Sequence, residues 1–411
     1  MFHIIGLGTT VPAELGSAAL SALAGAQVVM GSKRQLATVE HLLKAQRQQI
    51  LPALDALRAL ADALQNQTIA VLASGDPLFY GIGGWFAQHY ETDALAFYPA
   101  VSSIQSACHQ LGLSLQDVDV LSLHGRPLDM IRRKLKANRH LVILTDQHSQ
   151  PQILAKECLA AGFADSKFWV CENIGHDTQQ THVFLASDLI DSNQCFDPLH
   201  VTVIHIQGAG GVLPEFPGIP DERFVTDGKQ GSGMLSKREV RLAILSLLQP
   251  SSGEVGWDIG AGCGGVAVEW AYWNESSQIH AVEHHPDRLS CLQANRSRFG
   301  VVGNLHIVPG RGLAVLDQLP HPDKVFIGGS DGELEALLDL TWQRLSSNGV
   351  LLASAVTEQT KHRLIAFSEI CGGQMETVQV AVSKGEHLAG QIIYRPQLPV
   401  TLFKFSKPHH G

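Results

Sequence analysis

A glycine-rich turn follows a short apolar strand at residues 257–265, where the sequence runs Trp-Asp-Ile-Gly-Ala-Gly-Cys-Gly-Gly. Gly260, Gly262 and Gly265 match the spacing G-x-G-x-x-G, in which missing side chains let a nucleotide-type cofactor approach the backbone. The acidic Glu283 follows at about 20 residues, the distance expected of a carboxylate that accepts hydrogen bonds from ribose hydroxyls. This spacing indicates a cofactor site without choosing the cofactor.

Asp258 favours S-adenosylmethionine at this turn. A carboxylate just before the first glycine would repel the pyrophosphate of NAD, whereas it tolerates a ligand that carries an ammonium and a sulfonium group. Three alternatives stay open: a nicotinamide-dependent oxidoreductase, a protein that binds the cofactor without catalysis, and a turn that only packs a helix against a strand.

The composition is that of an ordinary globular protein, with 45% hydrophobic and 17% charged residues. The 411 residues suffice for about two to four domains. The net charge of −9 argues against general nucleic-acid binding. We find no apolar run long enough to span a membrane and no signal peptide, so we expect a cytoplasmic protein that does not associate with membranes.

The cysteines and histidines do not predict a metal site. The seven cysteines are spread along the chain without a C-x-x-C pair, which fits reduced thiols better than disulfides or a zinc site. The pairs His284–His285 and His409–His410 lack the i,i+4 spacing of helical metal ligands. We therefore expect no bound metal.

A proline- and glycine-rich stretch, residues 207–233, separates two α/β halves. In the first half, apolar runs predict strands at 4–7, 27–30, 69–73, 118–123, 141–145, 168–171 and 201–206. In the second half, they predict strands at 255–259, 280–283, 305–308, 324–327 and 350–355. The strands alternate with helical patterns such as 13–24, 103–111 and 239–248. This alternation predicts parallel sheets that bind ligands at the carboxyl ends of their strands.

Six motifs in the first half, in this order and spacing, resemble the tetrapyrrole methylase family. They lie at 5–8, 31–36, 74–81, 99–103, 124–127 and 172–175, and within the family they look like the C5-methylating domain of vitamin B12 biosynthesis. The second half resembles the C15-methylating, decarboxylating domain of the same pathway. Its motifs lie at 236–241, 257–265 with Glu269, 325–329, 355–357 and 399–400.

The resemblance implies a fold and an activity. Residues 1–206 would form a two-subdomain tetrapyrrole methylase fold, 207–233 a linker, and 234–411 a Rossmann-like (class I) S-adenosylmethionine methyltransferase domain. The activity would be methylation of precorrin-6B, or its cobalt form, at C5 and C15, with decarboxylation of the C12 acetate arm to give precorrin-8. Two S-adenosylmethionine sites and a tetrapyrrole substrate follow from the same resemblance, and we also expect a homo-oligomer.

The resemblance also implies the residues that contact the cofactors. In the first half they are Ser74, Gly75, Asp76, Phe79, Ser102, Ser103 and Thr145. In the second half they are Ser236, Gly260, Ala261, Gly262, Cys263, Gly264, Glu283 and Gly312. The chain departs from the family pattern at Thr9–Thr10, at 310–313, where relatives commonly have Gly-Asp-Ala-Pro, and at Leu398.

Methyl transfer from a sulfonium to an electron-rich carbon needs aligned reactants at about 3–3.5 Å rather than a nucleophilic triad. Consistent with this, we find no Ser-His-Asp or Cys-His arrangement, and we interpret Cys263 as a small filler. A substrate with many carboxylates needs basic partners, and the segment 126–139 is rich in them, although a solvated helix face explains it equally well. Our candidates for substrate contacts are His124, Arg126 and Lys237; Glu269 and His285 are candidates for the proton donor by residue type only.

Overall fold

The computed structural model describes residues 1–64, 66–228 and 233–407, so the pair His409–His410 lies outside the described residues. The chain forms two compact units: residues 1–128 with 137–210, and residues 129–136 with 211–411. Much of the stretch that we expected to be a linker belongs to the second unit, in which Ile219 and Phe224 are buried. The short segment 129–136 is also part of the second unit.

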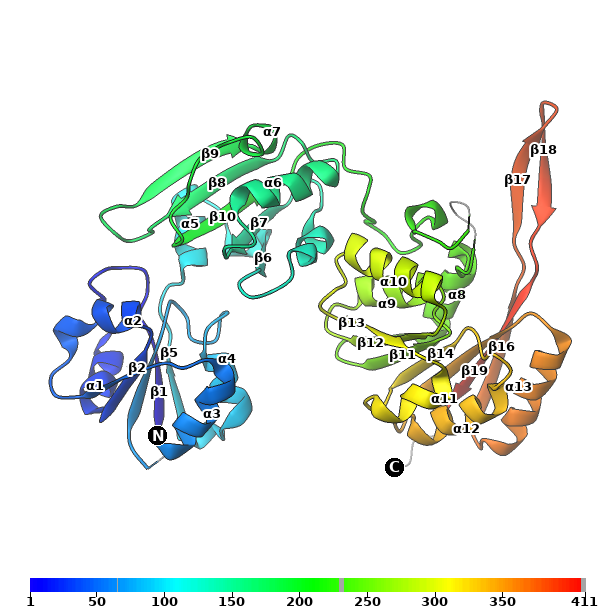
Figure 1. Cartoon of the computed structure of the whole chain (residues 1–411), viewed down its shortest axis with the longest axis horizontal. Helices are drawn as coiled ribbons and strands as arrows, with labels where there is room; N and C mark the ends of the chain where they lie inside the picture. The colour runs from blue at the N-terminus through cyan, green and yellow to red at the C-terminus, as the bar shows by residue number, and fades with distance from the viewer. Residues whose placement is uncertain (65, 229–232, 408–411) are drawn as a thin grey trace. The chain divides into compact units, whose positions relative to one another are not determined.

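A five-stranded parallel sheet begins the first unit (Figure 1), in the order β3 (Arg47–Ile50), β2 (Val28–Gly31), β4 (Ile69–Ala73), β1 (Phe2–Gly6), β5 (Leu95–Tyr98). Successive side chains of a strand point to opposite faces of the sheet. Ile5 accordingly packs with helices α1 (Ser17–Gly25) and α2 (Lys33–Thr38). Ile4 packs on the other face with α3 (Leu54–Ala63) and α4 (Gly83–His89).

The second sheet of this unit has the order β6 (Val118–Ser122), β7 (His140–Leu144), β10 (His200–His205), β8 (Lys167–Glu172), β9 (Gln180–Leu185). Only β6 and β7 pair parallel, so our expectation of parallel sheets is wrong here. A short loop joins β8 to β9, and closely connected strands pair antiparallel. The helices α5 (Ser103–Leu111), α6 (Pro151–Ala160) and α7 (Ala186–Leu189) accompany this second sheet.

The second unit has a seven-stranded sheet whose first five strands are parallel. They have the order β13 (Leu305–Pro309), β12 (Gln278–Glu283), β11 (Val255–Ile259), β14 (Lys324–Ile327), β15 (Val350–Ala355). This is the Rossmann-like order. The chain adds strands on one side of β11 as far as β13 and then crosses to the other side at β14, and such sheets bind ligands at this crossover point. The expected fold class is therefore confirmed for this unit.

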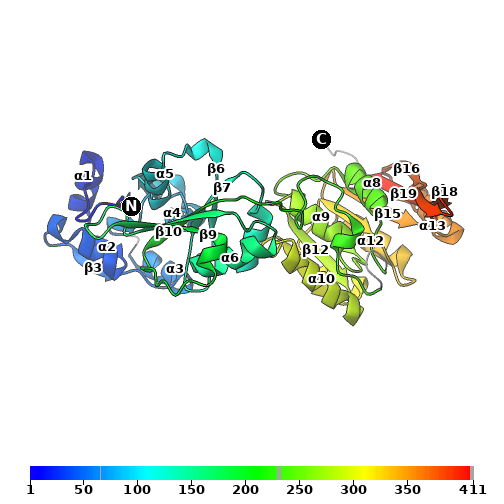
Figure 2. The same cartoon turned by 90° about the horizontal axis from the view of Figure 1, so that it is seen from above.

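Helices cover both faces of this sheet. One face packs against α8 (Arg238–Leu248), α9 (Gly265–Trp273) and α10 (Pro286–Arg298). On this face α9 lies against β12 (Figure 2), and α10 contacts β13. The other face packs against α12 (Leu334–Arg344) and α13 (Glu358–Ile370), and the short α11 (Gly312–Val315) contacts α12.

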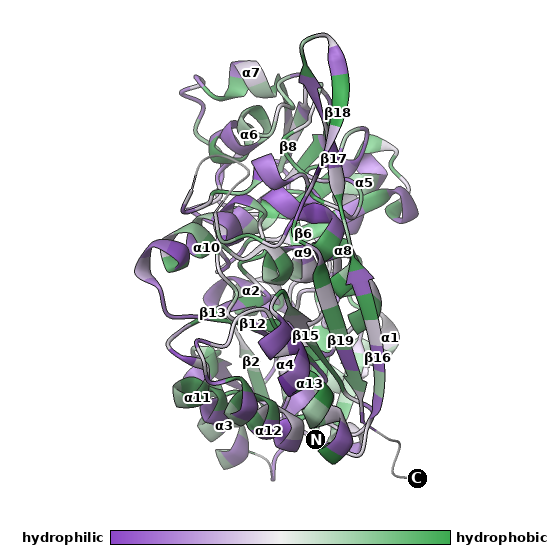
Figure 3. Ribbon diagram, turned by 90° about the vertical axis from the view of Figure 1, so that its right-hand side faces the viewer, coloured by the Kyte–Doolittle hydropathy of each residue, from purple (hydrophilic) through white to green (hydrophobic). Residues whose placement is uncertain are grey.

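Four C-terminal strands were not expected from the sequence. The strand β19 (Val400–Ser406) is largely hydrophobic (Figure 3) and pairs antiparallel with both β15 and β16 (Gln374–Val380). The strands β17 (Ser383–Leu388) and β18 (Gln391–Pro396) form a separate hairpin that projects beyond the sheet (Figure 1). Across the parts of the chain that the structure describes, no helix is long and apolar enough to cross a membrane.

Candidate functional site

The glycine turn of the second unit connects β11 to α9 at the carboxyl end of the sheet. Gly260 has φ +71°, and a Cβ added to it would lie 2.7 Å from the backbone nitrogen of Gly329. Gly262 has φ +58°, and a Cβ added to it would lie even closer to the carbonyl oxygen of Met234. Side chains are therefore excluded at both positions by conformation and by space. Both glycines therefore allow the turn to pack closely against Gly329 and Met234, and they contribute only backbone atoms to this end of the sheet.

Glu283 is joined to this turn by hydrogen bonds. Its Oε2 atom accepts from the backbone N–H of Gly262 at 2.9 Å, and Oε1 accepts from the N–H groups of His284 and His285, each at 2.9 Å. Its side chain is only 3% exposed. The acid thus fixes the end of β12 against the turn after β11, in addition to facing the ligand site.

A cavity of about 610 Å³ opens over these strand ends. This volume is typical of a site for a small ligand. Seven of our sequence candidates line it: Ser236, Lys237, Gly260, Ala261, Gly262, Glu283 and Gly312. Its apolar wall includes Leu235, Val240, Ile244, Val356 and Leu398. Cys263, Gly264, Glu269 and His285 are absent from its lining.

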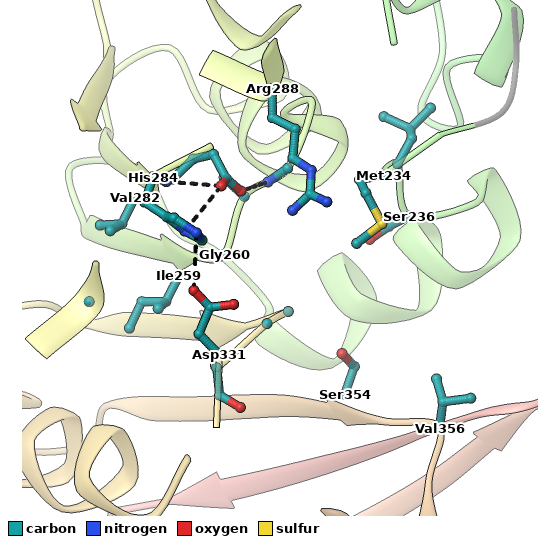
Figure 4. Close-up of a pocket in the computed structure, with 18 of the residues that line it drawn as sticks. Met234, Ser236, Ile259, Gly260, Val282, His284, Arg288, Asp331, Ser354 and Val356 are labelled. Atoms are coloured by element: carbon teal, nitrogen blue, oxygen red, sulfur yellow. Dashed lines mark hydrogen bonds and ion pairs between the residues drawn. The ribbon is translucent and has the colours of Figure 1, made fainter. Parts of the chain in front are cut away.

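Three polar side chains that no motif identified as site residues meet across this cavity. In Figure 4, Asp331 reaches from the loop after β14 towards His284, at the end of β12. The Asp331 Oδ2 atom lies 3.2 Å from His284 Nε2 and 4.0 Å from Arg311 Nη2. Asp331 has φ +50°, which is uncommon for a residue other than glycine. Only their position at the carboxyl ends of three strands could have indicated these residues.

Asp258 lies inside the sheet rather than in the cavity. It is fully buried, and one carboxylate oxygen accepts the N–H of Ala267 at 2.9 Å. Burial raises the pKa of Asp258 to about 7, so near neutral pH much of it carries no charge. Our argument that this carboxylate repels a pyrophosphate therefore loses its basis, and Asp258 does not discriminate between cofactors.

The segment 233–236 borders the turn on the side of α8. The Met234 carbonyl accepts the N–H of Cys263 at 2.9 Å, and Asp227 accepts the N–H of Met234 at 2.8 Å. Asp227 also pairs with Arg288, which lines the cavity together with Met234 and Ser236 (Figure 4). Burial raises the pKa of the Cys263 thiol, which agrees with a packing role rather than a nucleophilic one.

Glu269 belongs to a buried charge network next to the site. Its Oε2 atom pairs with Arg241 Nε at 2.7 Å, and both side chains are fully buried. Arg241 also pairs with Asp221 at 2.9 Å and donates to the Ser236 carbonyl at 2.6 Å. This network holds the border of the cavity in place, and the geometry gives no support to Glu269 as the proton donor.

The first unit brings three predicted loops together, because they follow β2, β4 and β5, which belong to one parallel sheet. Ser74, directly after β4, accepts hydrogen bonds from Gln35 (3.1 Å) and Arg34 (3.4 Å). A Cβ on Gly75 would lie 2.7 Å from the Cα of Ser102. Ser102 is buried and is the N-cap of α5, which begins at Ser103. The motifs at 31–36, 74–81 and 99–103 thus lie together at the carboxyl-terminal edge of this sheet.

Asp76 shapes the loop that follows. Its Oδ1 atom accepts the backbone N–H groups of Leu78 (2.8 Å) and Phe79 (3.2 Å), which closes an Asx turn. The turn leaves Phe79 and Tyr80 largely exposed. Here the side chain of Asp76 acts on its own loop, which carries the exposed aromatic ring of Phe79.

The remaining candidates of this unit follow β6 and β7, which are adjacent and parallel. The N–H of Gly125, next to His124, donates to Asp146 Oδ2 at 2.9 Å, and this bond lowers the pKa of Asp146. The guanidinium carbon of Arg126 lies 5.9 Å from the ring centre of Tyr80, beside the Asp76 turn. The hydroxyl of Thr145 is hydrogen-bonded to His200 Nε2 at 2.8 Å.

Two families match this chain, one in each half. Residues 1–190 match the family described as tetrapyrrole (corrin/porphyrin) methylases. Residues 224–407 match the family described as a precorrin methyltransferase domain. The first half therefore shows the expected tetrapyrrole methylase fold.

Relatives of similar length match almost the whole chain. A protein from a Sinorhizobium species named precorrin-6Y C(5,15)-methyltransferase, decarboxylating, is 32% identical over 98% of this chain and 96% of its own length. A protein of the same name from Mycobacterium tuberculosis H37Rv is 32% identical over 99% of this chain and 100% of its own length. A crystal structure titled precorrin-6y C5,15-methyltransferase from Geobacter metallireducens is 34% identical, covering 48% of this chain and 98% of that one, with a TM-score of 0.44.

Proposed function

This chain belongs to the family of the decarboxylating precorrin-6Y C(5,15)-methyltransferases, and from that premise we propose that it methylates a precorrin at C5 and C15 and removes carbon dioxide from its acetate arm. The observation that carries the proposal is that relatives of this name match both halves of the chain at 32% identity. We assign C5 methylation to the first unit, and C15 methylation with decarboxylation to the second.

The cavity of the second unit fits S-adenosylmethionine. When bound, this cofactor supplies an activated methyl group on its sulfonium. Gly260 and Gly262 line the cavity without side chains, and Glu283 retains acceptor capacity on Oε2 for a ribose hydroxyl. The chain itself has to bind and align the reactants, because alignment supplies most of the rate of such a displacement.

The walls of the same cavity suit decarboxylation. In that step the bond between the acetate methylene and its carboxylate carbon breaks, the electron pair enters the conjugated ring, and a proton then completes the new methyl group. The buried side chains of Leu235, Val240 and Ile244 line the cavity, and an acetate carboxylate held against them would lose contact with water, which favours its loss. We assign to Lys237, which lines the cavity at the start of α8, the binding of another carboxylate of the ring.

In the first unit we assign a second S-adenosylmethionine site to the edge formed by the loops after β2, β4 and β5. The loops that carry Gly75 and Ser102 pack closely against each other there, and Ser74 accepts a hydrogen bond from Gln35. Arg126, beside Tyr80, is our candidate for a carboxylate of the tetrapyrrole. We also propose that the protein forms a homo-oligomer, since Leu388, Ile392 and Tyr394 leave apolar area exposed on the hairpin of β17 and β18.

The experiment that tests the function is product mass after incubation of the full chain with S-adenosylmethionine and cobalt-free precorrin. We expect the product to gain two methyl groups and lose one carbon dioxide, and a parallel reaction with the cobalt form decides which substrate is used. Calorimetry with S-adenosylhomocysteine should give two sites, and none with NADH. Binding of NADH with no change in precorrin mass would support an oxidoreductase instead.

A further inference from the structure

The second unit includes a turn from far upstream in the sequence, residues 129–136. Its central side chain, Arg133, is 8% exposed. The guanidinium donates to the carbonyl of Ala271 near the end of α9, and Nη1 donates to Asn304 Oδ1 at 3.2 Å. It also lies 5.6 Å from the ring centre of Tyr272. Arg133 is thus held by three groups that belong to the second half of the sequence.

The same turn contacts the end of α10. Arg132 Nη1 donates to the carbonyl of Ser297 at 3.0 Å and to its hydroxyl at 3.1 Å. The Ser297 hydroxyl in turn donates to Asp129, and Lys134 pairs with Glu275 at 2.7 Å. Each polar side chain of the turn that is not fully exposed therefore has a partner on the surface formed by α9, α10 and the loops after them.

The surface is also shaped for the backbone of the turn. Gly300 has φ +65°, and a Cβ added there would lie 2.6 Å from the Asp129 carbonyl oxygen and 2.8 Å from the Arg133 nitrogen. Asn304 supports the same place, since its Nδ2 atom donates to the Ala271 carbonyl at 3.0 Å and to the Asn274 carbonyl at 2.9 Å.

The charges fit the helix ends. The last carbonyl groups of a helix lack partners within the helix and carry partial negative charge, so cationic donors stabilise them. Arg132 and Arg133 meet this requirement at α10 and α9. Desolvation on burial lowers the pKa of Arg133, and hydrogen bonds to the Ala271 carbonyl and Asn304 offset the cost of burying its charge.

We propose that the carboxyl-terminal ends of α9 and α10 form a docking site for an arginine-bearing turn, and that residues 129–136 occupy it as a structural part of the second unit. This assignment is independent of the proposed function, and it replaces substrate binding as the role of Arg132, Arg133 and Lys134. It also has a consequence for the cofactor turn. Because α9 begins at Gly265, directly after the glycine turn, the docked arginine holds the opposite end of the same helix.

Hydrogen exchange of the full chain, read peptide by peptide, tests this proposal. Arg133→Met keeps an apolar stem but removes the donors and the charge. We expect exchange in residues 265–304 to become about tenfold faster or more, with residues 1–128 unchanged. Lys136→Met is the matched control, because Lys136 is exposed in the same turn, and it should leave both regions as in the parent.

Gly300→Ala provides a second test, because it disturbs the seat of the turn without altering an arginine. It should accelerate exchange in the same region as Arg133→Met. Unchanged exchange in 265–304 for both variants overturns the proposal. If Arg133→Met leaves exchange unchanged and instead raises KM for the tetrapyrrole, the segment binds substrate and the docking assignment is wrong. Neither result depends on which reaction the second unit catalyses.

Discussion

The Oε2 atom of Glu283 lies 2.9 Å from the backbone nitrogen of Gly262, so the acid after β12 and the glycine turn after β11 are directly joined. The other oxygen accepts from His284 and His285. A carboxylate offers about four lone-pair sites, and three are thus occupied by the protein's own backbone. Glu283 therefore has two roles, since it fixes the shape of the turn and retains acceptor capacity for one ligand hydroxyl.

Replacing Glu283 should weaken one cofactor site and spare the other. Glu283→Gln keeps the size of the side chain but places an amide donor among backbone donors. Losing a charged contact costs about 1.5–3 kcal/mol, which corresponds to about 10- to 150-fold weaker binding. Titration of the full chain with S-adenosylhomocysteine measures this loss, with the exposed Glu358→Gln as control. If Glu283→Gln binds S-adenosylhomocysteine at both sites with the affinity of the parent, Glu283 does not take part in cofactor binding.

Adding a methyl group at Gly262 should close the downstream site. In Gly262→Ala the new Cβ meets the Met234 carbonyl, which also holds Cys263, so the turn has to move. Gly253→Ala is a matched control, because Gly253 also has positive φ (+84°) but has open space around its Cβ position. We expect Gly262→Ala to abolish S-adenosylhomocysteine binding at one site and Gly253→Ala to keep both. Equal binding by the two variants contradicts a close ligand approach.

A substitution of Asp76 should affect C5 methylation without affecting C15 methylation and decarboxylation. Asp76→Ala removes the acceptor that closes the turn at Leu78 and Phe79, so C5 methylation should be lost while C15 methylation and decarboxylation continue. Product mass would then show one methyl group gained and one carbon dioxide lost. Asp76→Asn keeps an oxygen acceptor and should restore much of the C5 activity. Loss of carbon dioxide release in Asp76→Ala would disprove this division between the units.

Asp258 should make the second unit less stable as the pH rises. Its pKa is raised from 3.8 to about 7 in the folded state. Between these values the folded chain binds more protons than the unfolded chain, so the free energy of unfolding falls with increasing pH. At about 1.4 kcal/mol for each unit, the effect amounts to at most about 4 kcal/mol.

The variant Asp258→Asn keeps an acceptor for the Ala267 N–H and does not titrate. Relative to the parent, it should therefore gain stability from about pH 4 to pH 7 and no more above that range. Urea unfolding of parent and variant at several pH values measures the difference, in which other carboxyl groups cancel. A constant difference across this range would show that Asp258 is charged in the folded protein throughout.

The local parts of the site could be predicted from the sequence. Buried strands such as β11 and β12 appear as short apolar runs, and the glycine turn with Glu283 has a spacing that depends on only one strand, one helix and the next strand. The structure confirms those elements because their signals are local. The polar strand β3 and the exposed hairpin of β17 and β18 gave no such signal, since neither buries a continuous apolar face.

What the sequence by itself determined is the identity of the two halves and the glycine turn with its acid. Tertiary structure decided which side chains share a space. Asp331, His284 and Arg311 are far apart or unremarkable in sequence, and they meet because parallel strands end at the same edge of the sheet. Asp258 lies in the sheet, where burial and not its sequence position sets its charge. Arg133 donates to the carbonyl of Ala271, which lies 138 residues further along the chain. Long-range packing of this kind leaves no periodic pattern, because it depends on how complete elements fit together in space.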